Sequence, residues 1–190
     1  MMLRNIPAVA GDAANGGNQN GQINQYQYFG LAAKFRPLVG DIRLEFNHWE
    51  PFQIALTGEY AKNLAFDETA IAAIAVNNRG AVSATDPLGV FVGRDTAWNA
   101  YLTVGDAALQ KRWDWNVSLG YRDVGSDALI DGFVDSDFGG GGTNVKGMTF
   151  IGNLALSSRV WLGLRWMSAR EVAGPQMKSD VFQFDVNGKF

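Results

Sequence analysis

Residues that could carry out catalysis are scarce in this 190-residue sequence. It has one histidine, His48, and no cysteine, which excludes thiol catalysis, disulfide bonds and cysteine-bound zinc. His48 stands beside Trp49 in a short expected turn, and no serine has a neighbourhood that predicts a Ser-His-Asp triad. The sequence therefore predicts a protein that is not an enzyme and that uses no cofactor.

Charged residues are instead placed at alternate positions of segments whose other positions are apolar. In residues 180–190 one parity reads Val, Gln, Asp, Asn, Lys and the other reads Phe, Phe, Val, Gly, Phe. Residues 112–122 alternate in the same way. This is the period of a β-strand with one polar and one apolar face. The charged residues on the polar parity of the expected strands are Arg43, Glu45, Glu59, Arg112, Asp114, Arg122, Arg165, Asp185 and Lys189.

These charges lie on expected strands whose length is close to that needed to cross a hydrocarbon layer. Seven such strands are expected, at residues 37–47, 52–61, 95–104, 112–122, 147–156, 160–167 and 180–190. Residues 25–35 form either an eighth strand or a loop, because their aromatic residues do not keep one parity. Residues 1–24 are rich in Gly, Asn and Gln, which predicts a flexible segment ahead of a barrel region at 25–190.

The connections between the expected strands alternate in length. Those at 47–51, 105–111 and 156–160 are short, and those at 62–94, 123–146 and 169–180 are long. Short turns at the periplasmic rim, with the C-terminus, and long loops outside are typical of a transmembrane barrel. Aromatic residues would then form two girdles at the membrane interfaces: Trp98, Tyr121, Trp166 and Phe182 at the outer rim, and Phe46, Phe52, Trp113 and Phe190 at the inner rim.

The charged parity is expected to face a lumen. A charge on the lipid side of a barrel costs about 2–4 kcal/mol at the midplane, whereas a wet lumen accommodates it. Both signs occur in similar number among these residues, which favours a weakly selective wall over a single-sign filter. The expected fold class is all-β, an antiparallel transmembrane β-barrel with seven to eight strands in this chain.

The connection at 62–94 is long enough to have a structure or role of its own. It contains an Ala-rich run, 67–76, that begins with two carboxylate residues, and this pattern predicts a short helix. The loop is expected either to fold into the pore mouth and narrow it, or to pack on its neighbours at the surface.

The connection at 123–146 contains Asp131, Asp135 and Asp137 next to the glycine run 139–142. Alternating aspartates offer oxygen ligands for calcium, but the full calcium-loop pattern with its terminal Glu is missing. A glycine run more often indicates flexibility. No metal site is predicted.

Composition excludes other classes of protein. The net charge is -3, the pI is near 5.1, and Lys and Arg are scattered singly, so nucleic-acid binding is not expected. The longest weakly polar stretch, 69–76, is far shorter than the roughly 20 residues of a membrane-spanning helix. The first residues lack the apolar core of an export signal. We expect that a signal was removed or that this sequence is a piece of a longer protein.

Four stretches together resemble the "putative porin" family of proteobacterial outer-membrane β-barrels. They are LTGEYAKNLAFD (56–67), LIDGFVDSDFGGGGTNVKG (129–147), LGLRWMSAREVAGP (162–175) and VFQFDVNGKF (181–190). The resemblance covers residues 35–190 and implies the C-terminal part of a barrel of about sixteen strands. It implies passive diffusion of small hydrophilic solutes or ions across the bacterial outer membrane. It also implies an assembly signal that the barrel-assembly machinery recognises, carried by Phe182, Phe184, Val186 and Phe190.

Partners follow from the same interpretation: outer-membrane lipid, the barrel-assembly machinery, small solutes, and other copies or a missing N-terminal barrel part. Two alternatives stay open. A closed eight-stranded barrel would have an interior that side chains fill, and would serve a structural or adhesion role without a pore. A soluble ligand-binding barrel or sandwich would instead turn the apolar rows at 113–119 and 182–186 inward.

Overall fold

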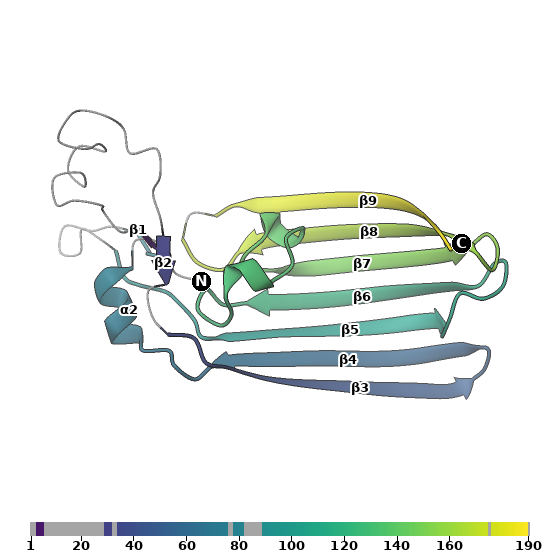
Figure 1. Cartoon of the computed structure of the whole chain (residues 1–190), viewed down its shortest axis with the longest axis horizontal. Coiled ribbons are helices and arrows are strands. Elements are labelled where there is room, and N and C mark those ends of the chain that lie inside the picture. Colours follow the sequence, from purple (N-terminus) through teal and green to yellow (C-terminus); the bar gives the residue numbers. More distant parts are fainter. Residues whose placement is uncertain are drawn as a thin grey trace, which may run out of the picture.

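Seven long antiparallel strands in chain order form one sheet in the computed structural model (Figure 1). The structure describes residues 3–5, 29–31, 34–75, 78–81, 89–174 and 176–189. The strands of this sheet are β3 (Pro37–Trp49), β4 (Phe52–Asn63), β5 (Thr96–Asp106), β6 (Trp115–Val124), β7 (Val145–Ala155), β8 (Val160–Glu171) and β9 (Lys178–Gly188). The expected all-β antiparallel fold is confirmed. Among the described residues, no helix combines the length and apolar character needed to cross a membrane.

The pairing register brings residues of one parity to the same face on all seven strands. One row of directly paired residues crosses the whole sheet on the apolar face: Leu44, Leu56, Leu102, Leu119, Phe150, Trp166 and Phe182. On the opposite face, Glu59 pairs with Asn99, which in turn pairs with Arg122. Because a slip of one residue would exchange the faces of a strand, this register preserves the separation that the sequence predicts.

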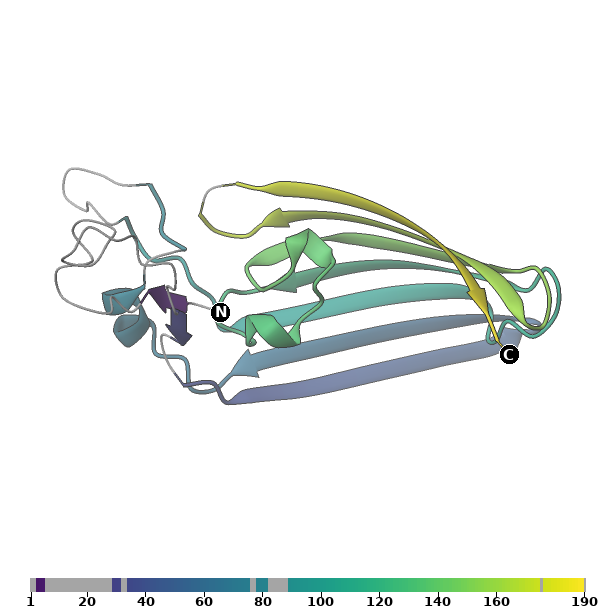
Figure 2. The same cartoon turned by 45° about the horizontal axis from the view of Figure 1, so that its top comes forward.

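The sheet is curved like a trough, and two short helical turns lie over one of its faces (Figure 2). These turns, η1 (Asp131–Phe133) and η2 (Phe138–Gly140), belong to the connection between β6 and β7. β3 and β9 form the two edges of the sheet, which is not closed within the described part of the chain.

The expected eighth strand is not part of this sheet. Of the described residues within 25–35, residues 29–31 form β2 (Phe29–Leu31), which pairs with β1 (Leu3–Asn5) in a separate two-stranded sheet, and 34–35 belong to no strand. The interpretation of 25–35 as a barrel strand is therefore wrong for the described residues, in accordance with the irregular parity of its aromatic residues.

Turns gather at one end of the trough and longer connections at the other, here named the turn rim and the loop rim (Figure 1). The turn rim carries residues 50–51, 107–114 and 156–159, and the loop rim carries 64–95, 125–144 and 172–177. The connections lie at the rims that the sequence predicts, but the expected alternation of short and long connections has one exception. Because β8 and β9 extend further than expected, the connection 172–177 is shorter than the turn 107–114.

The helix expected at 67–76 is present as α2 (Glu68–Ile74). Asp67 caps it, since its Oδ1 accepts a hydrogen bond of 3.0 Å from the backbone N–H of Ala70. A carboxylate at this position satisfies a backbone donor that the first helical turn leaves open. The last residue of the expected helix, Val76, lies outside the described residues.

Candidate functional site

The polar face of the sheet, here named the wet face, carries most of the charged residues that the sequence selects. Arg43, Glu45, Glu59, Arg122, Arg165 and Asp185 all lie on strands with their side chains on this face by register. Lys189 follows β9, and its Nζ lies 5.5 Å from the ring centroid of Trp161, which shares the wet parity. These seven residues are therefore brought to one surface.

Arg112 and Asp114 are not part of a strand of this surface, because β6 begins at Trp115 and not at Arg112. Trp113 has a positive φ of 76°, which is incompatible with an extended strand. The Asp114 carboxylate accepts hydrogen bonds from the backbone N–H groups of Gln110 and Lys111 at 2.8 and 2.6 Å. Both expected wall residues are therefore part of the turn 107–114, and their alternation with Trp113 continues the strand pattern into a turn.

The connection 125–144, here named the folded-in loop, is fixed to the wet face by a buried aromatic residue. Phe138 is only 1% exposed and packs with Val145, Met167 and Ala169 of β7 and β8. The guanidinium carbon of Arg122 lies 4.5 Å from the Phe138 ring centroid, a distance typical of a cation–π contact. Apolar packing on a largely polar face thus anchors the loop over β7 and β8.

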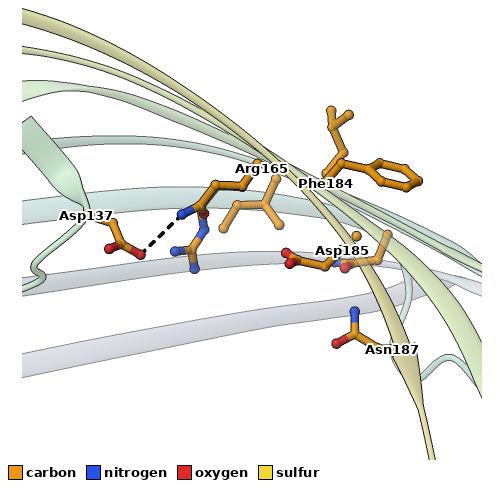
Figure 3. Close-up of a pocket in the computed structure, with 10 residues that line it drawn as sticks. Asp137, Arg165, Phe184, Asp185 and Asn187 are labelled. Atoms are coloured by element: carbon orange, nitrogen blue, oxygen red, sulfur yellow. Dashed lines mark hydrogen bonds between the residues drawn. The ribbon is translucent and has the colours of Figure 1, made fainter.

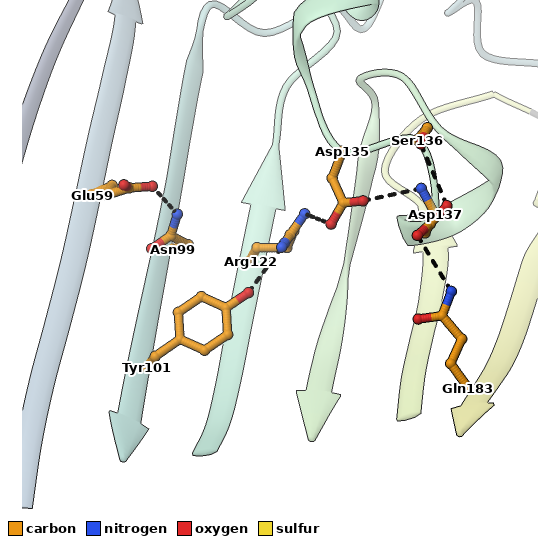
Figure 4. A network of polar contacts seen from close by, with 8 residues as sticks. All are labelled: Glu59, Asn99, Tyr101, Arg122, Asp135, Ser136, Asp137 and Gln183. Carbon is orange, nitrogen blue, oxygen red and sulfur yellow. Dashed lines mark hydrogen bonds and ion pairs between the residues drawn. The ribbon is translucent and has the colours of Figure 1, made fainter. Parts of the chain in front are cut away.

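A chain of polar contacts holds the same loop to the strands (Figure 4). Arg122 donates to Asp135 Oδ2 at 3.0 Å and to the Tyr101 hydroxyl at 2.9 Å. Asp137 donates its backbone N–H to Asp135 Oδ1 at 3.0 Å and accepts from Gln183 Nε2 at 3.3 Å. The loop therefore has polar links to both β6 and the edge strand β9.

The pKa of Asp135 reflects this network. Burial raises the pKa, but the Asp137 backbone N–H and the Arg122 guanidinium outweigh burial and hold it below the ordinary value of 3.8. Asp135 is thus an ionised partner of Arg122 at neutral pH.

Two sets of glycines make the arrangement possible. A Cβ at Gly120 would lie 2.1 Å from the Tyr101 ring, so only glycine lets that ring lie across β6 and reach Arg122. The run from Gly139 to Gly142 has φ values of 69°, 85°, 88° and 85°, in the left-handed region that glycine adopts without strain. In this structure the run forms the bend that leads from Phe138 back towards β7.

The aspartates considered for calcium are engaged by protein donors. Asp131 Oδ1 accepts from the backbone N–H and the hydroxyl of Thr143 at 2.9 and 2.5 Å, while Asp135 and Asp137 belong to the loop network. In the described ranges, no three His, Cys, Asp or Glu side chains come together as a metal site.

The longer connection 64–95 takes a different course. Ile71 and Ala75 of its helical part pack with Phe91 in a small core, against which Phe66 also packs. Its described residues lie beyond the loop ends of the strands and not over the wet face (Figure 1). For these residues the structure favours the surface-packed alternative over the loop that narrows the pore mouth.

A hollow of about 550 Å³ opens on the wet face beside the folded-in loop (Figure 3). Asp137 of the loop lines one side, and β7, β8 and β9 contribute Asn153, Arg165, Asp185 and Asn187. Arg165 and Asp185 were expected from the sequence to line the lumen, but their proximity to Asp137 was not. Strand register brings Arg165 and Asp185 together, and only the course of the folded-in loop adds Asp137.

The opposite, apolar face is uncovered. Leu102 is 46% and Leu119 48% exposed at the middle of the sheet. Charged residues occupy the apolar parity only at the strand ends, where the register places Lys62, Asp106, Asp123, Lys146, Arg170, Lys178 and Asp180. An apolar surface of this extent indicates contact with a membrane or another protein.

The expected aromatic girdles are found only in part. Trp166 and Phe182 lie in the same paired row as Leu102 and Leu119, and Trp113 lies in a turn. The rings of Trp98 and Tyr121 lie 5.5 Å apart towards the loop rim, and those of Phe52 and Trp115 lie 5.6 Å apart towards the turn rim. Three residues of the expected assembly signal, Phe182, Phe184 and Val186, are exposed on the apolar parity of β9. The fourth, Phe190, lies outside the described residues.

Comparison with known proteins adds a family. No curated protein and no solved structure is similar enough to this chain to count as a match. The family model described as putative porin matches residues 1–190, and the chain therefore belongs to the putative porin family, with a porin-like role in a membrane-embedded barrel.

Proposed function

We propose that this chain forms part of the wall of a water-filled channel in the bacterial outer membrane, through which small hydrophilic solutes and ions diffuse passively. The observation that carries the proposal is the separation of the two faces along all seven strands. Charges on the lipid side of a barrel are tolerated near the interfaces and cost about 2–4 kcal/mol at the midplane. The apolar face carries charges only at the strand ends, as lipid contact requires.

Further strands must complete such a channel. The backbone groups on the free edges of β3 and β9 would have no partner in the hydrocarbon layer, where each unsatisfied group is costly. Since seven successive antiparallel strands make the two edge strands parallel to each other, antiparallel closure needs an odd number of additional strands. A barrel of about sixteen strands satisfies this condition.

The wet face supports a channel more than a filled interior. It combines a hollow of about 550 Å³ with charged side chains of both signs. A closed eight-stranded barrel would need one strand that pairs with both β3 and β9. In the described segments, the strands outside the large sheet are β1 and β2, and they pair with each other over three residues. No observation favours the closed eight-stranded barrel. The polar residues of the wet face do not favour a soluble ligand-binding barrel, which would turn the apolar rows inward.

The surface of β9 supports a role in assembly. Phe182, Phe184 and Val186 project from the apolar parity of a free edge strand, where the barrel-assembly machinery would meet both the side chains and the unpaired backbone. Outer-membrane lipid would cover the same residues after insertion.

Single-channel conductance in a planar bilayer tests the proposal. The chain is refolded in detergent and compared with a form extended at its N-terminus by further strands. Stable, salt-dependent current steps from either form support the channel. A folded barrel that gives no steps in either form would contradict the channel and favour a structural role.

A further inference from the structure

The hollow on the wet face has a floor without a side chain. A Cβ added at Gly163 would lie 3.5 Å from Asn187 Nδ2, 3.6 Å from Asn153 Oδ1 and 3.6 Å from the Cβ of Asp185. Polar residues of the two flanking strands, β7 and β9, therefore surround an open patch of β8 backbone. Amide side chains both donate and accept hydrogen bonds, so this floor can bind a polar solute in more than one orientation.

Arg165 lines the same hollow (Figure 3). Its charge helps to lower the pKa of Asp135 in the folded-in loop, but among the described residues no carboxylate lies within ion-pair distance of it. Three other arginines are paired with carboxylates: Arg43 with Glu45 at 2.5 Å, Arg122 with Asp135 at 3.0 Å, and Arg94 with Asp123. Among the described residues Arg170 of the same strand has no ion pair either, but it lies on the apolar parity and not in the hollow. Within the described ranges neither Arg165 nor Asp185 forms an ion pair at the 4.0 Å limit. The register places Arg165 opposite Gln183 and Asp185 opposite Gly163, so the two charges are near diagonal neighbours on one face.

Opposite charges that line one hollow without neutralising each other define what it attracts. An anion would gain from the guanidinium fork of Arg165, but Asp137 and Asp185 would repel it. A cation would gain from the two carboxylates, and Arg165 would repel it. A solute that carries both charges a few ångströms apart interacts favourably with both sides.

We propose that this hollow is a passage site for small zwitterions of the α-amino-acid type. The solute carboxylate faces Arg165 and the ammonium group faces Asp185, with Asn153 and Asn187 as further hydrogen-bond partners. The inference rests on the proposed channel function and names a solute class for it. The partly open hollow suits transit, because conduction requires binding that is favourable enough to enter and weak enough to leave.

The folded-in loop contributes to the site through Asp137. Its Oδ2 accepts from Gln183 Nε2 at 3.3 Å, which fixes a second carboxylate at the side of the hollow. The solute would therefore pass between the loop and the edge of β9.

Current block by three solutes of similar size provides the test: serine as the zwitterion, lactate as the anion and ethanolammonium as the cation. Each is added at constant potassium chloride to the form of the protein that conducts. Serine is expected to reduce the single-channel current at about one third of the concentration that lactate or ethanolammonium needs, or less.

Two variants remove one charge each. Arg165→Gln and Asp185→Asn are each expected to raise the half-blocking concentration of serine by about threefold to tenfold. The two single-charge solutes should respond in opposite ways: Arg165→Gln improves block by ethanolammonium, and Asp185→Asn improves block by lactate. Matched controls are Arg170→Gln and Asp180→Asn, which change the same residue types on the apolar parity of β8 and β9 and should leave serine block unchanged.

The potassium chloride steps separate the two levels of failure. Normal steps with equal block by all three solutes, or serine block that both variants leave unchanged, would overturn the zwitterion site and leave the channel intact. Absence of steps from every form would overturn the channel, and this inference with it.

Discussion

Two connections leave the same rim of the sheet and end in different places. The described residues of 64–95 form a capped helix and a small core of their own, and they lie beyond the strand ends. Residues 125–144 are shorter and contain only single helical turns, yet they lie over the wet face and contact the edge strand through Gln183. Length and helical content therefore do not decide which loop enters a trough.

The difference lies in where each loop finds its apolar partner. Ile71 packs against Phe91 of its own connection, so the longer loop is satisfied locally. Phe138 packs against β7 and β8, so the burial of its ring brings the loop onto the sheet. Arg122 then adds a charge pair with Asp135 at the same place.

The largest expected effect comes from Phe138→Ala. Removal of a fully buried phenylalanine costs about 3–5 kcal/mol, and we expect this loss in the free energy of opening of the folded-in loop. Amide hydrogen exchange of residues 125–144 measures the opening, and single-channel conductance should rise as the loop leaves the wet face. Phe133→Ala is the matched control, because Phe133 of the same loop is 86% exposed and should change the opening by less than about 0.5 kcal/mol. Equal effects of the two changes would mean that Phe138 does not anchor the folded-in loop.

The second effect concerns the longer loop. Ile71 is 1% exposed in the core of 64–95, so Ile71→Ala should lower the local stability of this connection by about 2–4 kcal/mol. Conductance should stay unchanged, because this core does not touch the wet face. Val90→Ala, at a residue 66% exposed, serves as the control in hydrogen exchange. A conductance change for Ile71→Ala alone would show that the longer loop narrows the channel after all.

The sheet could be predicted from the sequence, because polar and apolar residues alternate along every strand that has one polar and one apolar face. The apolar row from Leu44 to Phe182 consists entirely of residues whose parity is visible in the chain. The helix start at Asp67 was predictable for the same kind of reason, since capping is local. Errors appear where alternation continues beyond the strand, as at Arg112 and Asp114, whose turn depends on the backbone of Trp113.

The site could be predicted only in part. Arg122, Arg165 and Asp185 follow from parity, but the position of Asp135 and Asp137 depends on contacts with strands that are distant in the sequence. The cue was present in Phe138, an aromatic residue directly before four glycines. A glycine run does not by itself show whether it provides flexibility or a left-handed bend, and only the sheet contacts of Phe138 decide between them.

The third effect tests the charge pair. Arg122→Gln removes the ionic partner of a partly buried carboxylate, and we expect the folded-in loop to open more easily by about 1–3 kcal/mol. A double-mutant cycle with Asp135→Asn should give a coupling of about 0.5 kcal/mol or more, measured by hydrogen exchange of the loop. Arg170→Gln, on the apolar parity at the loop rim, should leave the loop unaffected. Zero coupling would mean that the Arg122–Asp135 pair does not help to hold the loop.

The smallest effect is the pH dependence of the same pair. The pKa of Asp135 in the folded state lies below its ordinary value of 3.8. A carboxyl group with a lowered folded pKa contributes stability that is complete above the unfolded pKa and is lost as the pH falls through the folded pKa. We therefore expect the loop to stay closed from neutral pH down to about pH 5 and to loosen only below 3.8, with a rise in conductance.

Because other carboxylates also become protonated there, the informative quantity is the difference between the native protein and Asp135→Asn. The native protein should lose more loop protection than the variant over this range, because Asp135→Asn already lacks the carboxylate whose protonation weakens the pair with Arg122. Identical acid responses of the two proteins would assign the pH dependence to other groups.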